Sequence, residues 1–188
     1  MAITRTSQTH PLQIAELSCP QYAGKIGITF CPGKYDPLAA TGKWDRDLTA
    51  DLDTIEKWGA SAILTLIEAV EMIELRVPHL GQAITERKLS WYHNPIHDYS
   101  IPNQHFETQW INERQAIYMH LAQGENVLVH CKGGLGRAGM IAARMLIELG
   151  CNTKLAIREV RRVRPGAIET RAQLNYVQNQ QLIARHTC

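Results

Sequence analysis

Short apolar runs alternate along this chain with segments in which apolar residues recur at helical spacing. The runs are rich in Ile, Leu and Val, which favours strands. Runs without polar interruption are typical of strands that are covered on both faces of a sheet. Strands are expected over 12–17, 25–30, 61–67, 89–96 and 126–130.

Between these runs, apolar residues recur every three or four positions, which predicts helices with one buried face. Leu48, Leu52 and Ile55 share such a face, and Gly59 is placed to end their helix. Asn152 is the expected N-cap of a later helix. Helices are expected over 47–58, from Pro78 to about Lys88, from about Phe106 to a stop at Gly124, and over 137–149, 153–163 and 170–185.

Strands that alternate with helices predict an α/β fold with a central, mostly parallel sheet flanked by helices. The 188 residues fit one domain, and no internal repeat or linker divides them. We expect a flexible N-terminus over 1–10 and a single domain over 11–188. Ligands of such folds bind beyond the carboxyl ends of the strands, so the loop after 126–130 is the first candidate site.

Composition, net charge and cysteine count limit the classes of protein and of binding partner that fit this chain. The chain is 45% hydrophobic and 20% charged, which suits a packed core. A formal charge of +2 is too weak to indicate nucleic-acid or membrane binding. An odd number of scattered cysteines disfavours a disulfide framework and suggests a reducing compartment. We therefore expect a cytoplasmic monomer. The cysteines are Cys19, Cys31, Cys131, Cys151 and Cys188.

The loop after the strand over 126–130 carries two competing motifs. Its residues 134–139 match GxGxxG, the phosphate-binding pattern of dinucleotide folds. That motif requires an acidic residue at the end of a second strand about 20 positions later. Glu159 has this spacing, but Leu155 and Val160 place it in a helix, which disfavours nucleotide binding. The loop reads His130-Cys131-Lys132-Gly133-Gly134-Leu135-Gly136-Arg137.

The second motif is Cys-x5-Arg, in which a cysteine at a strand end is followed by a glycine-rich turn and an arginine at a helix start. Glycines permit the positive φ angles with which backbone N–H groups converge on an anion. The helix N-terminus adds further N–H groups and its dipole. In that field Cys131 should ionise and become a nucleophile, and Arg137 can bind two phosphate oxygens. The simpler alternative is a buried structural cysteine in a turn.

At these residues the sequence resembles the cysteine-dependent protein tyrosine phosphatase superfamily, whose signature is His-Cys-x5-Arg. HCKGGLGRAG is most similar to the dual-specificity type and to its cyclin-dependent-kinase-associated phosphatase subgroup, and the similarity includes 91–98 and 164–173. The resemblance covers about 25–183 and implies hydrolysis of phosphotyrosine and phosphoserine/phosphothreonine in a protein or peptide, through a phosphocysteine and without metal or cofactor. It implies Cys131 as nucleophile and His130 as the residue that orients the loop. It assigns phosphate binding to Lys132, Gly133, Gly134, Leu135, Gly136 and Arg137.

Two further roles rest on the resemblance and have structural alternatives. Asp98 matches the family's general acid, although a turn aspartate is common at such a position and His97 could also donate a proton. Gln173 matches a water-positioning glutamine, but Thr170-x-x-Gln173 is also a capping box. The two roles of Gln173 are compatible only if its amide points away from the Thr170 backbone. The arginines at 161, 162 and 164 are expected at an exposed helix end.

One position departs from the family pattern. Ala138 replaces the usual Ser or Thr, whose hydroxyl stabilises the departing thiolate when the phosphocysteine is hydrolysed. A phosphate-binding pseudophosphatase with little turnover is therefore the main alternative. An arsenate reductase or sulfurtransferase is a third possibility, although no second cysteine is evidently placed to form a disulfide. Pro95 prevents His93 and His97 from sharing a helix face, so no metal site is expected.

Overall fold

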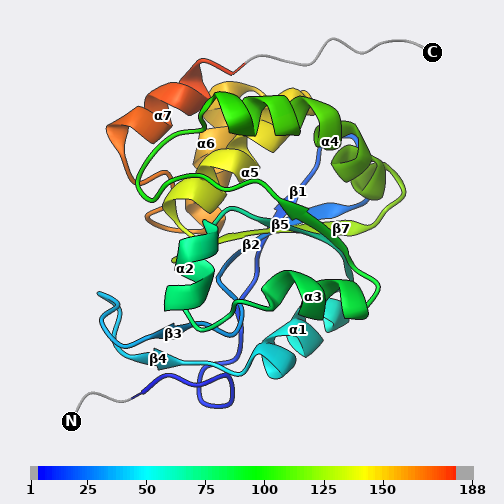
Figure 1. Ribbon diagram of the computed structural model, residues 1–188. Coiled ribbons are helices and arrows are strands. Elements are labelled where there is room, and N and C mark those ends of the chain that lie inside the picture. Colours follow the sequence, from blue (N-terminus) through cyan, green and yellow to red (C-terminus); the bar gives the residue numbers. More distant parts are fainter. Residues whose placement is uncertain (1–3, 181–188) are drawn as a thin grey trace.

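The structure is a computed structural model that describes residues 4–180. Its main element is a five-stranded sheet in the order β1-β2-β7-β5-β6 (Figure 1). β1 is antiparallel to β2, and the other three pairs are parallel. This confirms the predicted α/β fold. The strands are β1 (Ala15–Ser18), β2 (Lys25–Phe30), β5 (Ala60–Thr65), β6 (Ser90–His93) and β7 (Asn126–Cys131).

Helices cover both faces of the sheet (Figure 1). Two of them lie on one face, α1 (Leu48–Lys57) and α3 (Leu80–Glu86). The opposite face is covered by α4 (Gln104–Ala122), α5 (Gly136–Glu148), α6 (Thr153–Val163) and α7 (Arg171–Gln178). All residues of α5 are buried, which places the β7–loop–α5 unit in the centre of the core.

Every predicted strand and helix is found, with ends shifted by a few residues, and Asn152 caps α6. The last helix ends at Gln178; residues 181–185 of its predicted range lie outside the described residues. Three short elements were not predicted, because elements of two to six residues carry too little periodicity to be recognised. They are β3 (Tyr35–Asp36), β4 (Trp44–Asp45) and α2 (Ala69–Glu74).

Residues 4–10, within the segment predicted to be flexible, contact the rest of the domain. Arg5 pairs with Trp44 of β4, and its N–H donates to the carbonyl of Lys43 over 2.8 Å. The buried Ser7 hydroxyl donates to Asp51 over 2.9 Å. Residues 4–10 therefore contact the domain through backbone and side-chain bonds.

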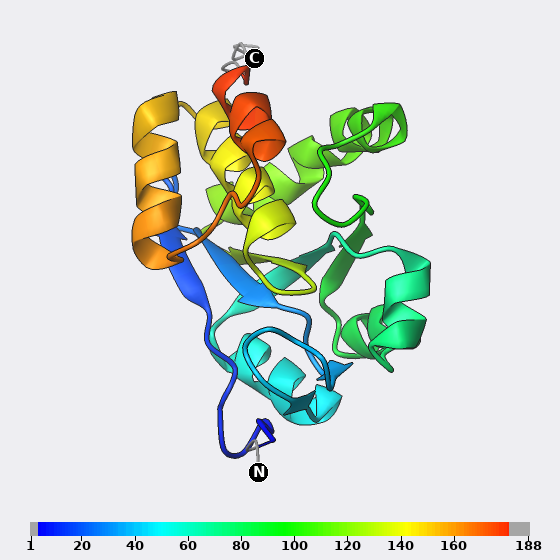
Figure 2. The ribbon, with the colours of Figure 1, turned by 90° about the vertical axis from the view of Figure 1, so that its left-hand side faces the viewer.

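Four segments from different parts of the chain surround the carboxyl end of β7. Figure 2 shows the loop before α5 with α2 on one side and the connection from α6 to α7 on the other. The loop after β6 and the segment around β3 complete this rim. The topology thus gathers residues from distant parts of the chain at the place where the sequence predicts the site.

Candidate active site

Cys131 is the last residue of β7 and is 3% exposed. The loop then turns directly into α5, whose N-terminus follows at Gly136. Gly134 has a φ of 66°, and a Cβ there would collide with the backbone of Thr29 and Phe30. The positive φ expected for the loop glycines is thus confirmed at Gly134. At Gly136 the reason for glycine is space, because a Cβ would meet the carboxylate of Glu169.

Arg137 lies beside this loop with its guanidinium held from several directions. Its Nη1 and Nη2 donate to the two carboxylate oxygens of Glu71 over 2.7 and 2.8 Å. Nη1 also donates to the carbonyl of Ile96 over 2.9 Å, and Nη2 lies 2.8 Å from Oδ1 of Asp98. Burial opposes the arginine's charge, but the bonds to Glu71 and the nearby acidic groups raise its pKa overall. Arg137 is therefore a fixed, permanently charged group.

The structure brings Asp98 into the site through this ion pair. Its side chain is 44% exposed, so the carboxylate is open to solvent on one side and contacts Arg137 on the other. The same Oδ1 accepts from the N–H of Tyr99 over 3.0 Å, as in an ordinary aspartate turn. Neighbouring His97 is 77% exposed and pairs with Glu68 at 2.9 Å. Of these two candidate acids, Asp98 is the one in contact with Arg137.

His130 precedes Cys131 and is completely buried. Nε1 of Trp91 donates to the Thr65 hydroxyl over 2.9 Å, and that hydroxyl lies 2.8 Å from Nε2 of His130. The Thr65 hydroxyl therefore links the Trp91 indole to the His130 ring. Burial lowers the pKa of His130 to about 3, so the ring is neutral at physiological pH. This chain of bonds fixes the imidazole directly before Cys131.

Gln173 is completely buried and forms the capping box predicted from Thr170. Its Oε1 accepts from the N–H groups of Glu169 and Thr170 over 3.0 and 3.3 Å. Its Nε2 donates to the carbonyl of Ser100, in the loop that carries Asp98, over 3.3 Å. The amide thus faces the Thr170 backbone. Water positioning by Gln173 stays a prediction that requires this amide to turn.

Two further residues near Cys131 were not predicted as part of the site. Lys34 is 4% exposed, and its Nζ donates to the carbonyl of Lys132 over 3.3 Å. Burial lowers its pKa. Cys31 is also buried, and its N–H donates to the same carbonyl over 3.3 Å. Burial raises the pKa of the Cys31 thiol, which makes it a poor nucleophile despite its place near Cys131.

The prediction that the arginines at 161, 162 and 164 lie at an exposed helix end is only partly correct. Arg162 is 66% exposed and pairs with Glu159, as expected. Arg164 is half-buried and donates from Nε to the carbonyl of Gly134 over 2.9 Å and from Nη2 to that of Gly133 over 3.1 Å. It therefore contacts the candidate phosphate loop, because the turn after α6 directs its side chain back toward the start of α5.

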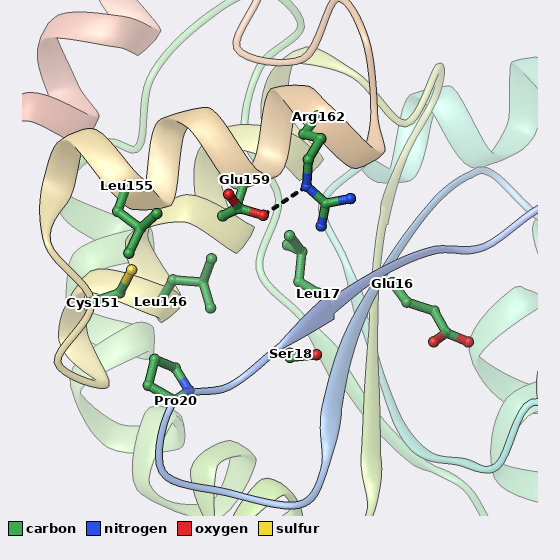
Figure 3. A pocket seen from close by; sticks show the side chains of 9 residues that line it. All are labelled: Glu16, Leu17, Ser18, Pro20, Leu146, Cys151, Leu155, Glu159 and Arg162. Carbon is green, nitrogen blue, oxygen red and sulfur yellow. Dashed lines mark hydrogen bonds and ion pairs between the residues drawn. The ribbon is translucent and has the colours of Figure 1, made fainter.

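A pocket of about 240 Å³ lies between β1 and α6 (Figure 3). Leu17, Leu146 and Leu155 contribute apolar side chains, and Arg162 is already neutralised by Glu159 over 2.7 Å. None of the predicted site residues lines it. Within residues 4–180, no three metal-binding side chains cluster, and no helix has the length and apolar character needed to cross a membrane.

Comparisons with known proteins agree with this geometry. Residues 42–151 match the family model described as "Polymorphic toxin system, DSP-PTPase phosphatase". The chain is 28% identical over 170 residues to cyclin-dependent kinase inhibitor 3 of Rattus norvegicus, covering 88% of this chain and 74% of the relative. It is 31% identical over 131 residues to protein tyrosine phosphatase type IVA 3 of Homo sapiens, covering 70% of each chain.

A solved structure gives the same result for the fold. The crystal structure of kinase associated phosphatase, with its catalytic-site cysteine replaced by serine, superposes with a TM-score of 0.76 at 26% identity. The match covers 89% of this chain and 92% of that chain. Taken with the family model and the relatives, it shows that this chain belongs to the DSP-PTPase family of phosphatases and is similar to kinase associated phosphatase.

Proposed function

We propose that this chain hydrolyses phosphotyrosine and phosphoserine/phosphothreonine monoesters of proteins through a phosphocysteine intermediate. The observation that carries this proposal is the convergence of Cys131, Arg137 and Asp98 at one glycine-rich loop that opens into α5. A nucleophile, an anion-binding arginine and a carboxyl group are the three functions that a phosphoryl transfer of this kind needs.

In the first step, the Cys131 thiolate attacks phosphorus and the bond from phosphorus to the substrate oxygen breaks. Arg137 and the backbone N–H groups of 132–137 bind the phosphoryl oxygens. Within the described residues, the Nε–H of Arg137 has no acceptor and Nη2 contacts Asp98, so this edge of the guanidinium can receive two oxygens. The arriving phosphate then displaces Asp98, whose protonated form gives its proton to the leaving oxygen.

In the second step, water attacks the phosphocysteine and the bond between sulfur and phosphorus breaks. Asp98 accepts the proton of that water, and phosphate leaves with the Cys131 thiolate restored. Gln173 would orient the water after its amide has left the Thr170 backbone. His130 keeps the loop in place through Thr65 and needs no change of protonation.

The substrate class and cellular setting belong to the same proposal. The similarity to cyclin-dependent kinase inhibitor 3 and to a protein tyrosine phosphatase supports a phosphorylated protein as substrate. At 188 residues, the chain has no segment that resembles the phosphotyrosine-recognition loop of the longer classical enzymes. We therefore propose a pocket that admits phosphoserine and phosphothreonine as well as phosphotyrosine. The proposal also includes a cytoplasmic location and a monomeric state.

The deciding experiment is hydrolysis of p-nitrophenyl phosphate by the wild-type chain and by Cys131→Ser. We expect vanadate-sensitive turnover in the wild type and none in the variant. Trapping of a phosphorylated cysteine by rapid acid quench would identify the intermediate. Turnover that survives Cys131→Ser would refute the proposed nucleophile, and tight phosphate binding without turnover would instead indicate a pseudophosphatase.

Ala138 predicts that hydrolysis of the phosphocysteine is the slow step. The residue is buried in the first turn of α5 next to Arg137. In the family that the chain resembles, a Ser or Thr hydroxyl at this position donates to the departing sulfur. A hydrogen bond to a charged group contributes about 1.5–3 kcal/mol, or roughly a tenfold to hundredfold change in rate. We expect Ala138→Ser to accelerate dephosphorylation by that factor in single-turnover measurements, without accelerating phosphorylation.

Ala142→Ser is the matched control, because Ala142 is equally buried one turn further along α5. It should leave both steps unchanged. A dephosphorylation rate that is the same in wild type and Ala138→Ser would show that the missing hydroxyl does not limit turnover.

A further inference from the structure

In the candidate phosphate loop, the four backbone carbonyls before α5, those of residues 132–135, each accept a hydrogen bond from another segment. The carbonyl of Lys132 accepts from the Cys31 N–H and the Lys34 ammonium, both over 3.3 Å. The next two carbonyls, of Gly133 and Gly134, accept from the Arg164 guanidinium over 3.1 and 2.9 Å. The carbonyl of Leu135 accepts from the Ile168 N–H over 3.4 Å and, within α5, from the Gly139 N–H over 2.9 Å.

Because the peptide bond is planar, the hydrogen bonds to these carbonyls also fix the directions of the N–H groups that follow them. In a trans peptide, the C=O of one residue and the N–H of the next point in opposite directions. A donor that holds the carbonyl of Gly133 therefore fixes the direction of the Gly134 N–H. In the same way, the bond to the Gly134 carbonyl fixes the Leu135 N–H. One planar guanidinium thus orients two consecutive N–H groups of the loop.

We propose that Arg164 is a positioning residue that holds the Gly134 and Leu135 N–H groups toward the phosphoryl group at Cys131. It acts through the loop, because its Nε and Nη2 donate to the carbonyls, on the side of each peptide plane opposite to the N–H groups. The inference rests on the proposed function, since it concerns the same phosphate-binding loop. Arg164 anchors that loop although it lies 33 residues after Cys131 in the chain.

The segment that carries Arg164 is itself built to stay in place. Ile168 has a φ of 60°, which is unfavourable for a β-branched residue, yet it is 2% exposed and packed in the core. Arg161 donates to the carbonyls of Ala167 and Ile168, each over 3.2 Å. Ala167 also packs where a Cβ on Gly139 would lie. A strained backbone that surrounding contacts maintain indicates a conformation that the fold requires. In this segment, that conformation brings the Arg164 guanidinium and the Ile168 N–H to the loop carbonyls.

The experiment measures anion binding and turnover separately. Tungstate is titrated calorimetrically into Cys131→Ser protein with Arg164 intact or changed to Met, which keeps an unbranched apolar side chain and removes both donors. We expect the Kd for tungstate to rise by about tenfold to a hundredfold, because two hydrogen bonds from a charged group are lost. In the Cys131 background, the same change should lower kcat/KM for p-nitrophenyl phosphate by at least that factor.

Two variants separate positioning from simple stability. Arg164→Lys keeps the positive charge but lacks the planar fork that matches the two carbonyls, and it should recover part of the tungstate affinity. Arg162→Met removes an exposed arginine from the same helix end and should change nothing. A folded Arg164→Met protein that binds tungstate as tightly as its parent would overturn the proposal. If Arg164→Met does not fold, an Arg164→Lys protein with unchanged affinity would overturn it.

The outcomes also distinguish this inference from the proposed function. If the wild type hydrolyses no phosphomonoester but tungstate affinity depends on Arg164, the enzymatic proposal fails and the positioning role stands. If the wild type turns over and both Arg164 variants bind tungstate normally, the enzymatic proposal stands and the positioning role fails.

Discussion

Arg144→Met is expected to lower the free energy of unfolding by about 3–5 kcal/mol, the usual result of removing one partner from a buried ion pair. For a chain of this length, that loss corresponds to a fall in melting temperature on the order of 10 °C. Thermal unfolding followed by circular dichroism measures both. The effect should appear without any ligand, because Arg144 lies outside the candidate active site.

The expected size follows from a polar network between α4, α5 and α7. Arg144 is 5% exposed and donates to Glu148 over 2.7 Å and to Glu107 over 2.9 Å, and it also contacts the hydroxyl of Tyr176. Glu148 further accepts from Tyr118 over 2.7 Å, and burial together with this carboxylate raises the pKa of Tyr118. Methionine fills the space but leaves Glu148 charged and buried without its cation.

Arg158→Met is the matched control, because Arg158 is 72% exposed and lies 3.4 Å from Glu159. Exposed pairs contribute about 0–1 kcal/mol, so its melting temperature should stay near that of the wild type. The double variant Arg144→Met/Glu148→Leu removes both charges and should recover part of the loss. Equal stability of Arg144→Met and Arg158→Met would contradict the role of the network.

The β7–loop–α5 unit could be predicted because its signals are local. An apolar run, a glycine-rich turn and an apolar helix follow one another in the chain, and Cys131 and Arg137 lie at the two ends of the turn. Asp98 also follows a strand whose carboxyl end lies at the same edge of the sheet, but its proposed role came from the family resemblance. Local periodicity was thus sufficient to find the loop with Cys131 and Arg137, and the resemblance was needed to add Asp98.

Residues whose role depends on tertiary contacts were not predictable in this way. Glu71 lies 66 positions before Arg137, on a six-residue helix that is too short to give a periodic signal. Arg164 follows a helix end rich in arginine, where solvent exposure is the normal expectation. Lys34 and Arg144 are buried cations, and a lysine or arginine in a sequence gives no sign of burial without its partner. The missed residues are therefore those that support the loop and the core from a distance.

Among them, Glu71 is expected to have the largest effect on activity. Its carboxylate forms both bonds to the end of the Arg137 guanidinium, and Glu71 is 7% exposed. Burial acts against its charge, but the bonds from Arg137 and from the Glu68 N–H outweigh burial, so the pKa of Glu71 lies below its ordinary value. Glu71 is thus ionised at neutral pH, and its bonds to Nη1 and Nη2 hold the guanidinium of Arg137 in one orientation in the candidate site.

Glu71→Gln should lower kcat/KM for p-nitrophenyl phosphate by about a hundredfold to a thousandfold, the rate equivalent of about 3–4 kcal/mol for a broken buried ion pair. The amide oxygen of the introduced glutamine can accept a hydrogen bond from one guanidinium nitrogen. Its amide nitrogen carries N–H groups and cannot accept from the other. Arg137 is then free to turn toward Asp98, the acidic partner that remains at 2.8 Å, and it competes less well for phosphate. Steady-state kinetics and tungstate inhibition measure both consequences.

Glu68→Gln provides the same chemical change three positions earlier, at the N-cap of α2. Its partner is the exposed His97, so activity should fall by less than about threefold, as for other exposed ion pairs. The melting temperatures of both variants are compared to separate folding from function. If the two substitutions reduced kcat/KM equally, Arg137 would not depend on Glu71 for its orientation. A selective loss in Glu71→Gln would show that a carboxylate distant in sequence sets the phosphate-binding geometry of the loop.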